Sequence, residues 1–207
     1  MSNTHLKDKI CEIGKRLYDK GLLVAYDGNI SARISDEVWT TPSGVCKGYL
    51  TPEMLVCTDL SGKVLVGDNP SSELKMHLMV YAKSNALAVV HSHPPYATAY
   101  ASAHIALNRY ILVETITSLG VVPLAEYATP STDEVPASIA PLIAGHKAIL
   151  LANHGALSWG TSLDEAYFTM ESLELSAKTQ FLAHLLGRGK DIPDEKVSFL
   201  KELLARK

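Results

Sequence analysis

Two runs of small and branched apolar residues constrain the fold of this 207-residue chain more than any other feature. Residues 86–93 read ALAVVHSH and residues 147–155 read KAILLANHG, and each run ends where Pro or Gly interrupts it. Short apolar runs bounded in this way predict buried strands, which need other elements to cover them. We therefore expect one domain, residues 1–207, with helices packed on a central sheet.

The rest of the chain alternates between helical and strand-like patterns. Short β-like runs broken by Gly and Pro predict sheet with tight turns from Leu22 to about Val66. A further short strand is expected at 121–127. Apolar residues at helical spacing predict the helices, which are expected at 4–20, from Ser71 or Ser72 onward, at 94–104, at 132–145 and from Ser162 to about Leu186.

Three histidines stand near the ends of the two apolar runs. His91 and His93 are two residues apart, so along an extended chain their side chains point to the same face. His154 ends the second run and is followed by the turn-forming Gly155. Three imidazoles with an open fourth position describe a catalytic zinc site. The alternative is that they are unrelated histidines, hydrogen-bonded to nearby carbonyl or carboxylate groups.

A carboxylate and several turns could complete such a site. Glu73 follows Ser71 and Ser72 at the start of a predicted helix, where it could bind a metal, act as a base or only complement the helix dipole. The two serines offer hydroxyls and helix N-terminal amides to a phosphate. Two upstream turns could point further amides at an anion, and they contain Asn29, Ser43 and Gly44.

Composition excludes several classes of protein. The formal net charge of -3 and the hydrophobic fraction of 47% give no reason to expect nucleic acid or an anionic membrane as a partner. The N-terminal segment is charged and amphipathic, unlike a signal peptide, and no segment has 18 successive apolar residues. We therefore expect a cytoplasmic protein. The three cysteines have no paired spacing and are expected to be buried free thiols: Cys11, Cys46 and Cys57.

The motifs G-N-x-S, T-P-S-G, P-S-S-E, H-S-H and N-H-G occur in an order that resembles the class II aldolase/adducin family, and most closely its L-fuculose-1-phosphate aldolases. The resemblance extends over about residues 5–187. It implies a three-layer α/β/α fold around a mixed, largely antiparallel sheet, although sequence patterning alone leaves the strand directions open. It also implies a fourfold-symmetric homotetramer with active sites between neighbouring subunits.

The resemblance further implies a role for each motif. A divalent metal, zinc with Mn²⁺ or Co²⁺ as alternatives, would be bound by His91, His93 and His154, and Glu73 would be the acid/base and could reach the metal. The proton donor on the aldehyde side would come from the adjoining subunit, where Tyr110 and Glu114 are equally good candidates. The substrate phosphate would be held by Asn29, Ser43, Gly44, Ser71 and Ser72.

These roles imply reversible cleavage of a ketose 1-phosphate, such as L-fuculose 1-phosphate, to dihydroxyacetone phosphate and an aldehyde such as L-lactaldehyde. On the same scaffold, a ribulose-phosphate 4-epimerase, a sugar-phosphate dehydratase and a decarboxylase are alternatives. Glu73 favours the aldolase over the epimerases, which usually carry aspartate there. A non-catalytic adducin-like interaction module is the alternative from a different class, and the retention of all three histidines with Glu73 argues against it.

Overall fold

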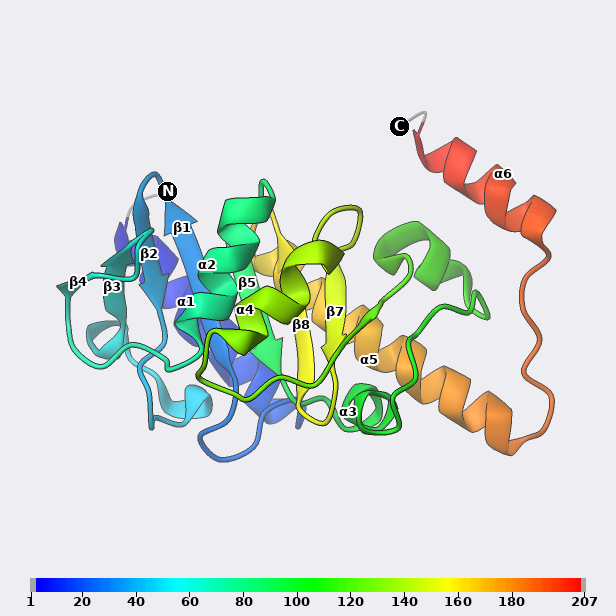
Figure 1. The fold of residues 1–207 in the computed structure, drawn as a ribbon, viewed down its shortest axis with the longest axis horizontal. Coiled ribbons are helices and arrows are strands. Elements are labelled where there is room, and N and C mark those ends of the chain that lie inside the picture. The colour runs from blue at the N-terminus through cyan, green and yellow to red at the C-terminus, as the bar shows by residue number, and fades with distance from the viewer. Residues whose placement is uncertain (1–2, 206–207) are drawn as a thin grey trace.

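The computed structural model describes residues 3–205 and shows a single eight-stranded sheet with helices on both faces (Figure 1). The strand order is β4-β3-β2-β1-β5-β8-β7-β6. Every neighbouring pair is antiparallel except β6 with β7. The expected three-layer fold with a mixed, largely antiparallel sheet is therefore confirmed.

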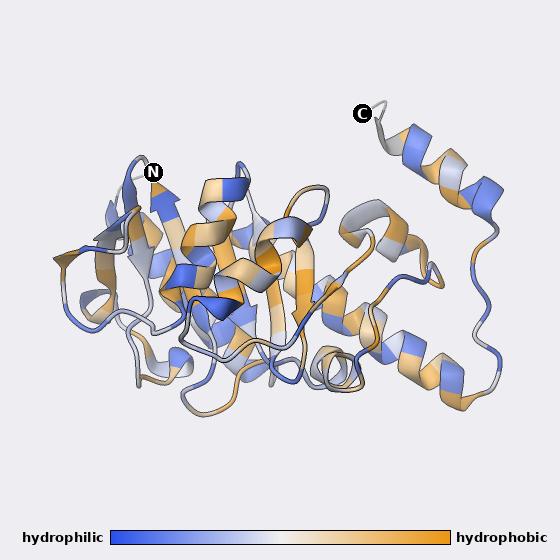
Figure 2. Ribbon diagram, viewed as in Figure 1, coloured by the Kyte–Doolittle hydropathy of each residue, from blue (hydrophilic) through white to orange (hydrophobic). Residues whose placement is uncertain are grey.

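The strands follow the apolar runs of the sequence, and all five residues of β5 are buried. The strands' bounds are β1 (Asn29–Ile34), β2 (Glu37–Thr40), β3 (Val56–Asp59), β4 (Val64–Val66), β5 (Ala88–Ser92), β6 (Leu124–Ala125), β7 (Ala148–Leu151) and β8 (Gly155–Gly160). In Figure 2 the central strands are largely coloured as apolar, which agrees with their burial between two helical layers. The strand predicted at 147–155 ends earlier than expected. Strand β7 stops at Leu151, a turn follows, and β8 begins at Gly155.

Two helical layers enclose the sheet. The first core cluster joins one face to α1 and α5, and the second joins the other face to α2 and α4. The helices span α1 (Asn3–Asp19), α2 (Leu74–Lys83), α3 (Pro95–Ser102), α4 (Glu134–Ile139), α5 (Leu163–Leu185) and α6 (Asp194–Ala205). Short helical turns occupy η1 (Lys47–Tyr49), η2 (Pro52–Met54), η3 (Thr115–Leu119) and η4 (Ala140–Leu142). Among residues 3–205, no helix combines the length and apolarity needed to cross a bilayer.

Three local features differ from the sequence-based expectations. Helix α2 begins at Leu74, so neither Ser71 nor Ser72 is its N-cap; Ser71 Oγ instead accepts a hydrogen bond from the Glu73 amide at 3.3 Å. Helix α6 was not expected, and it stands away from the sheet at the end opposite β4 (Figure 1). All three cysteines are free, but only Cys57 is fully buried.

Candidate metal centre and anion pocket

Three imidazole rings meet where β5 ends and β7 turns into β8. His91 lies in β5, His93 follows that strand, and His154 lies in the turn before β8. One ring nitrogen from each histidine lies within 4.8 Å of the other two, and the Nε2 atoms of His91 and His93 are 3.1 Å apart. The turn needs glycine at 155, because an added Cβ would lie 2.5 Å from His93 Cδ2. The sheet therefore brings together all three predicted ligands.

The outer nitrogens of two rings face oxygen atoms. His91 Nδ1 donates to the Ala156 carbonyl oxygen at 2.9 Å, and His93 Nδ1 faces Asp27 Oδ2 at 3.5 Å. Metal-binding histidines usually have a carbonyl or carboxylate on the nitrogen that does not bind the metal. The two contacts leave the Nε2 atoms directed at a common centre, as a metal site requires.

Glu73 closes the centre from the loop before α2. Its Oε2 lies 3.3 Å from His91 Nε2 and accepts a hydrogen bond from the Asn29 amide at 3.0 Å, and its Oε1 lies 3.3 Å from His154 Nε2. Oε1 is buried and has no hydrogen-bond partner among the described residues. Burial favours the neutral carboxylic acid, but His91, His154 and Asn29 outweigh it and hold the pKa of Glu73 below its usual range. Glu73 is thus an ionised carboxylate at neutral pH.

The protonation of the histidines also suits a metal. Burial, reinforced by His91, lowers the pKa of His154 to about 4, and the same causes lower the pKa of His93. Both rings are therefore neutral at pH 7, which is the form that binds metal. Three imidazoles beside a buried carboxylate oxygen that has no hydrogen-bond partner among the described residues form a donor set that fits zinc.

A buried hydrogen-bonded chain supports the site from behind. Ser31 Oγ bonds to His77 Nδ1 and to the Tyr81 hydroxyl, each at 2.7 Å, and so ties β1 to α2. Asn29 precedes Ser31 by two residues on the same face of β1 and is paired with His91 of β5. The register of β1 and the packing of α2 together hold Asn29 and Glu73 next to the imidazoles.

A cavity of about 240 Å³ opens beside the imidazoles. Its wall includes His93, His154 and Glu73, and also every residue predicted to hold a phosphate: Asn29, Ser43, Gly44, Ser71 and Ser72. The backbone joins the turn that contains Ser43 to the segment before α2, because the Ser43 amide donates to the Asn69 carbonyl at 2.9 Å and the Ser71 amide donates to the Thr41 carbonyl at 3.1 Å. Segments far apart in the sequence therefore form a single polar pocket next to the candidate metal centre.

Tyr110 and Glu114 are not among the residues that line this cavity. The Tyr110 carbonyl accepts from the Ile192 amide at 2.7 Å, and Lys201 Nζ lies 4.8 Å from the centre of its ring. Glu114 immediately precedes η3. Their role at the site of a neighbouring subunit stays a prediction.

Sequence reasoning missed several residues of the cavity, among them Tyr26, Asp27, Lys47, Pro130 and Ser131. Asp27 directly precedes the G-N-x-S motif, and this position could have identified it as a residue of the cavity. Lys47 follows the T-P-S-G turn by three residues and reads as an ordinary surface lysine, yet only 3% of it is exposed.

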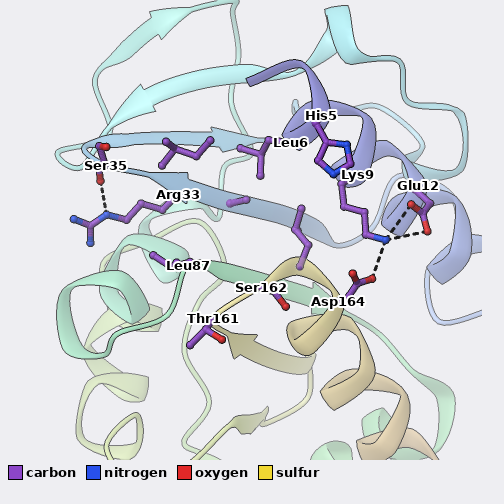
Figure 3. Close-up of a pocket in the computed structure, with 13 residues that line it drawn as sticks. His5, Leu6, Lys9, Glu12, Arg33, Ser35, Leu87, Thr161, Ser162 and Asp164 are labelled. Carbon is purple, nitrogen blue, oxygen red and sulfur yellow. Dashed lines mark hydrogen bonds and ion pairs between the residues drawn. The ribbon is translucent and has the colours of Figure 1, made fainter. Parts of the chain in front are cut away.

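A larger cavity of about 470 Å³ lies at the opposite ends of β1 and β5, between α1 and the start of α5 (Figure 3). Its Lys9 is already paired with Glu12 and Asp164, at 3.1 and 2.8 Å. None of the three clustered histidines lines it. The smaller cavity is therefore the candidate site, because it adjoins the possible metal ligands.

Comparisons with known proteins agree with this geometry. The family described as Class II Aldolase and Adducin N-terminal domain matches residues 8–181. A 3-oxo-tetronate 4-phosphate decarboxylase of Cupriavidus necator is 33% identical in an alignment of 182 residues that covers 86% of this chain and 84% of that protein. An L-fuculose phosphate aldolase of Methanococcus maripaludis is 32% identical, with 86% of this chain and 96% of that protein covered. A solved L-fuculose 1-phosphate aldolase superposes with a TM-score of 0.91 at 31% identity and covers 99% of this chain and 98% of its own.

Proposed function

The chain belongs to the class II aldolase and adducin family, and we propose that it is a metal-dependent lyase that cleaves a ketose 1-phosphate to dihydroxyacetone phosphate and an aldehyde. One observation carries the proposal: Glu73 lies 3.3 Å from both His91 and His154 and shares one cavity with turns suited to an anion. An acid/base, a candidate metal-binding cluster and a phosphate pocket are three of the parts that this reaction needs. We propose zinc as the metal, with Mn²⁺ or Co²⁺ as alternatives.

The reaction breaks the bond between C3 and C4 of the ketose. The electron pair of that bond passes to the C2–C3 half, which becomes the enediolate of dihydroxyacetone phosphate. When bound, the metal would supply Lewis-acid stabilisation for the negative charge that develops on the oxygens of this half. His91, His93 and His154 would hold it.

The residues of this chain would bind the substrate and move the proton. The pocket containing Ser43, Ser71 and Ser72 would hold the phosphate and so place C3 beside the imidazole cluster. Glu73 would remove the C3 proton of dihydroxyacetone phosphate in the synthetic direction, and after cleavage it would pass to C3 a proton that it has taken up from solvent. The hydrogen bond from Asn29 would keep the carboxylate aimed at C3.

Decarboxylation of 3-oxo-tetronate 4-phosphate is a second candidate, favoured by the similarity to the Cupriavidus necator enzyme. Loss of CO2 from that 3-oxo acid leaves the same three-carbon enediolate, so the same phosphate pocket and Glu73 would serve. The two reactions differ in one requirement. Retro-aldol cleavage needs an acceptor for the C4 hydroxyl proton, for which we propose Tyr110 or Glu114 of a neighbouring subunit in a homotetramer. Decarboxylation needs no such group.

A product assay distinguishes the candidates. Zinc-loaded protein is incubated with a panel of ketose 1-phosphates and, separately, with 3-oxo-tetronate 4-phosphate. Dihydroxyacetone phosphate with an aldehyde supports the aldolase, and the same triose with CO2 supports the decarboxylase. A rearranged pentulose phosphate without free triose would indicate an epimerase. Loss of water from the sugar phosphate would indicate a dehydratase. No turnover of any substrate would contradict the proposal and favour an interaction module.

A further inference from the structure

Lys47 is a buried lysine in the wall of the candidate active-site cavity. It begins η1, whose backbone lies directly against α1: a Cβ added to Gly14 would be 2.5 Å from the Lys47 carbonyl oxygen. This close approach leaves little freedom in the backbone at residue 47. The side chain extends to the Tyr26 carbonyl, to which Nζ donates a hydrogen bond at 2.6 Å, and Tyr26 also lines the cavity.

The ammonium group of Lys47 has no carboxylate partner within ion-pairing distance among the described residues. A lysine ammonium has three N–H donors, and the carbonyl of Tyr26 accepts only one. Burial lowers the pKa of Lys47, against the opposing influence of Asp27, Cys46 and Glu73. An unpaired charge in such a place is costly unless a ligand of opposite charge compensates it.

Lys9 in the larger cavity shows the contrast (Figure 3). Its Nζ lies 2.8 Å from Asp164 Oδ1 and 3.1 Å from Glu12 Oε2, so its charge is compensated within the chain. Lys47 has no such compensation, and its cavity is walled by hydroxyl-bearing residues such as Ser43 and Ser71. Among the described residues that line this cavity, Lys47 is the only lysine or arginine.

We propose that Lys47 supplies the positive charge that holds the phosphate group of the substrate and thereby restricts the site to phosphorylated substrates. This inference rests on the proposed function and adds a specificity-determining residue to it. A phosphate dianion would accept the N–H groups that Tyr26 leaves free, while the serine hydroxyls and turn amides donate to its other oxygens. Lys47 would contribute the positive charge, and the hydrogen bonds from the turns would fix the orientation of the phosphate.

The test measures the binding of inorganic phosphate to zinc-loaded protein by calorimetry and by the rise in melting temperature. Lys47→Gln keeps a donor for the Tyr26 carbonyl but removes the charge, and Lys47→Met removes both. We expect both variants to bind phosphate roughly tenfold to a hundredfold more weakly than wild type, the range for one charge-assisted hydrogen bond. Lys9→Met is the matched control and is expected to bind phosphate as wild type does.

The melting temperature without phosphate separates binding from structural support. If Lys47 serves the ligand, Lys47→Met melts at or above the wild-type temperature, because an uncompensated charge has been removed. Wild-type affinity for phosphate in Lys47→Gln would overturn the inference, and so would wild-type protein that does not bind phosphate. Wild-type protein that binds phosphate through Lys47 but turns over no sugar phosphate would leave this inference standing and reject the proposed function instead.

Discussion

The Nδ1 atom of His91 lies 2.9 Å from the carbonyl oxygen of Ala156, across the pairing of β5 with β8. A carbonyl oxygen only accepts hydrogen bonds, so the proton of a neutral His91 ring is on Nδ1. Its Nε2 then presents a lone pair towards His93 and Glu73. The β-sheet thus selects the tautomer that a metal requires before any metal arrives.

The first prediction concerns metal content. We expect purified protein to carry about one zinc ion per chain, and His91→Ala to lose it with little change in secondary structure, because a catalytic metal does not normally hold together a domain of this size. Elemental analysis and circular dichroism measure the two effects. His184→Ala, an exposed histidine of α5, is the control. Full zinc occupancy in His91→Ala would remove this histidine from the ligand set.

The second prediction separates proton transfer from metal binding at Glu73. Wild-type enzyme is expected to exchange one C3 proton of dihydroxyacetone phosphate with deuterium from solvent even without an aldehyde. Glu73→Gln keeps the size of the side chain but cannot accept the proton, so exchange is expected to fall about 10²–10⁴-fold while zinc remains bound. Proton NMR follows the exchange. Undiminished exchange would place the base elsewhere, and joint loss of zinc and exchange would make Glu73 chiefly a ligand.

The third prediction concerns the anion pocket. Ser71→Ala is expected to raise KM for a phosphorylated ketose by an amount equivalent to about 1.5–3 kcal/mol, with little effect on the unphosphorylated sugar. Steady-state kinetics with both substrates gives the comparison. Ser71 also accepts a hydrogen bond from the Glu73 amide, whereas Ser72 lines the same cavity and serves as a second variant. Equal losses on both substrates would point to misplacement of Glu73 rather than to a lost phosphate contact.

The fourth prediction concerns stability at low pH. Burial, with a further effect of the nearby His91, lowers the pKa of His77 from 6.5 to about 3. Between these values the unfolded chain binds a proton that the folded chain excludes, so stability falls as the pH falls. From pH 7 to pH 5, His77 accounts for a loss of about 2 kcal/mol in the free energy of unfolding.

His77→Gln is expected to remove that share of the pH dependence. Denaturant unfolding of metal-free protein at the two pH values measures it. The variant retains the dependence due to His93 and His154, whose pKa values burial also lowers. An identical loss in wild type and variant would show that the His77 ring accepts a proton in the folded protein.

The fifth prediction links α5 to the metal centre. The two carboxylate oxygens of Glu174 accept the amides of Tyr96 and Ala97, at 3.0 and 2.9 Å, in the first turn of α3, directly after His93. Glu174→Ala leaves these amides without their partners, at a cost of about 1–3 kcal/mol per unsatisfied group. We expect a lower melting temperature and weaker zinc binding, the latter measured by competition with a chelator. Wild-type zinc affinity in a destabilised variant would limit Glu174 to a structural role.

The sequence was sufficient to predict the histidine cluster but not its whole surroundings. His91 and His93 share a face because of strand geometry alone, and the turn at Gly155 identified His154 as a strand-end residue. The burial of Lys47 depends instead on the contact between α1 and η1, which joins residues far apart in the chain. A lysine in a turn has no local pattern that distinguishes a buried position from an exposed one.

Local sequence patterns also could not predict the directions of the strands or the structure of the C-terminal segment. An apolar run looks the same in parallel and antiparallel sheets, so the expectation of a mixed, largely antiparallel sheet followed only from the family resemblance. The run at 147–155 did not reveal that β8 continues after the turn, because Gly155 reads as a terminator. Helix α6 lies beyond the resemblance, which ends near residue 187.

The pairing of β5 with β8 would make the content of the proposed metal a measure of correct strand register. His91 is opposite Leu157, and a slip of one residue would turn His91 to the other face of the sheet, away from His154 and Glu73. A chain with that error could keep its strands and much of its helix content while it lost the convergence of the three imidazoles. The content of the proposed zinc in a preparation would therefore measure the fraction of molecules in which β5 and β8 have the correct register. Spectroscopy of secondary structure does not distinguish these molecules from those with the slipped register.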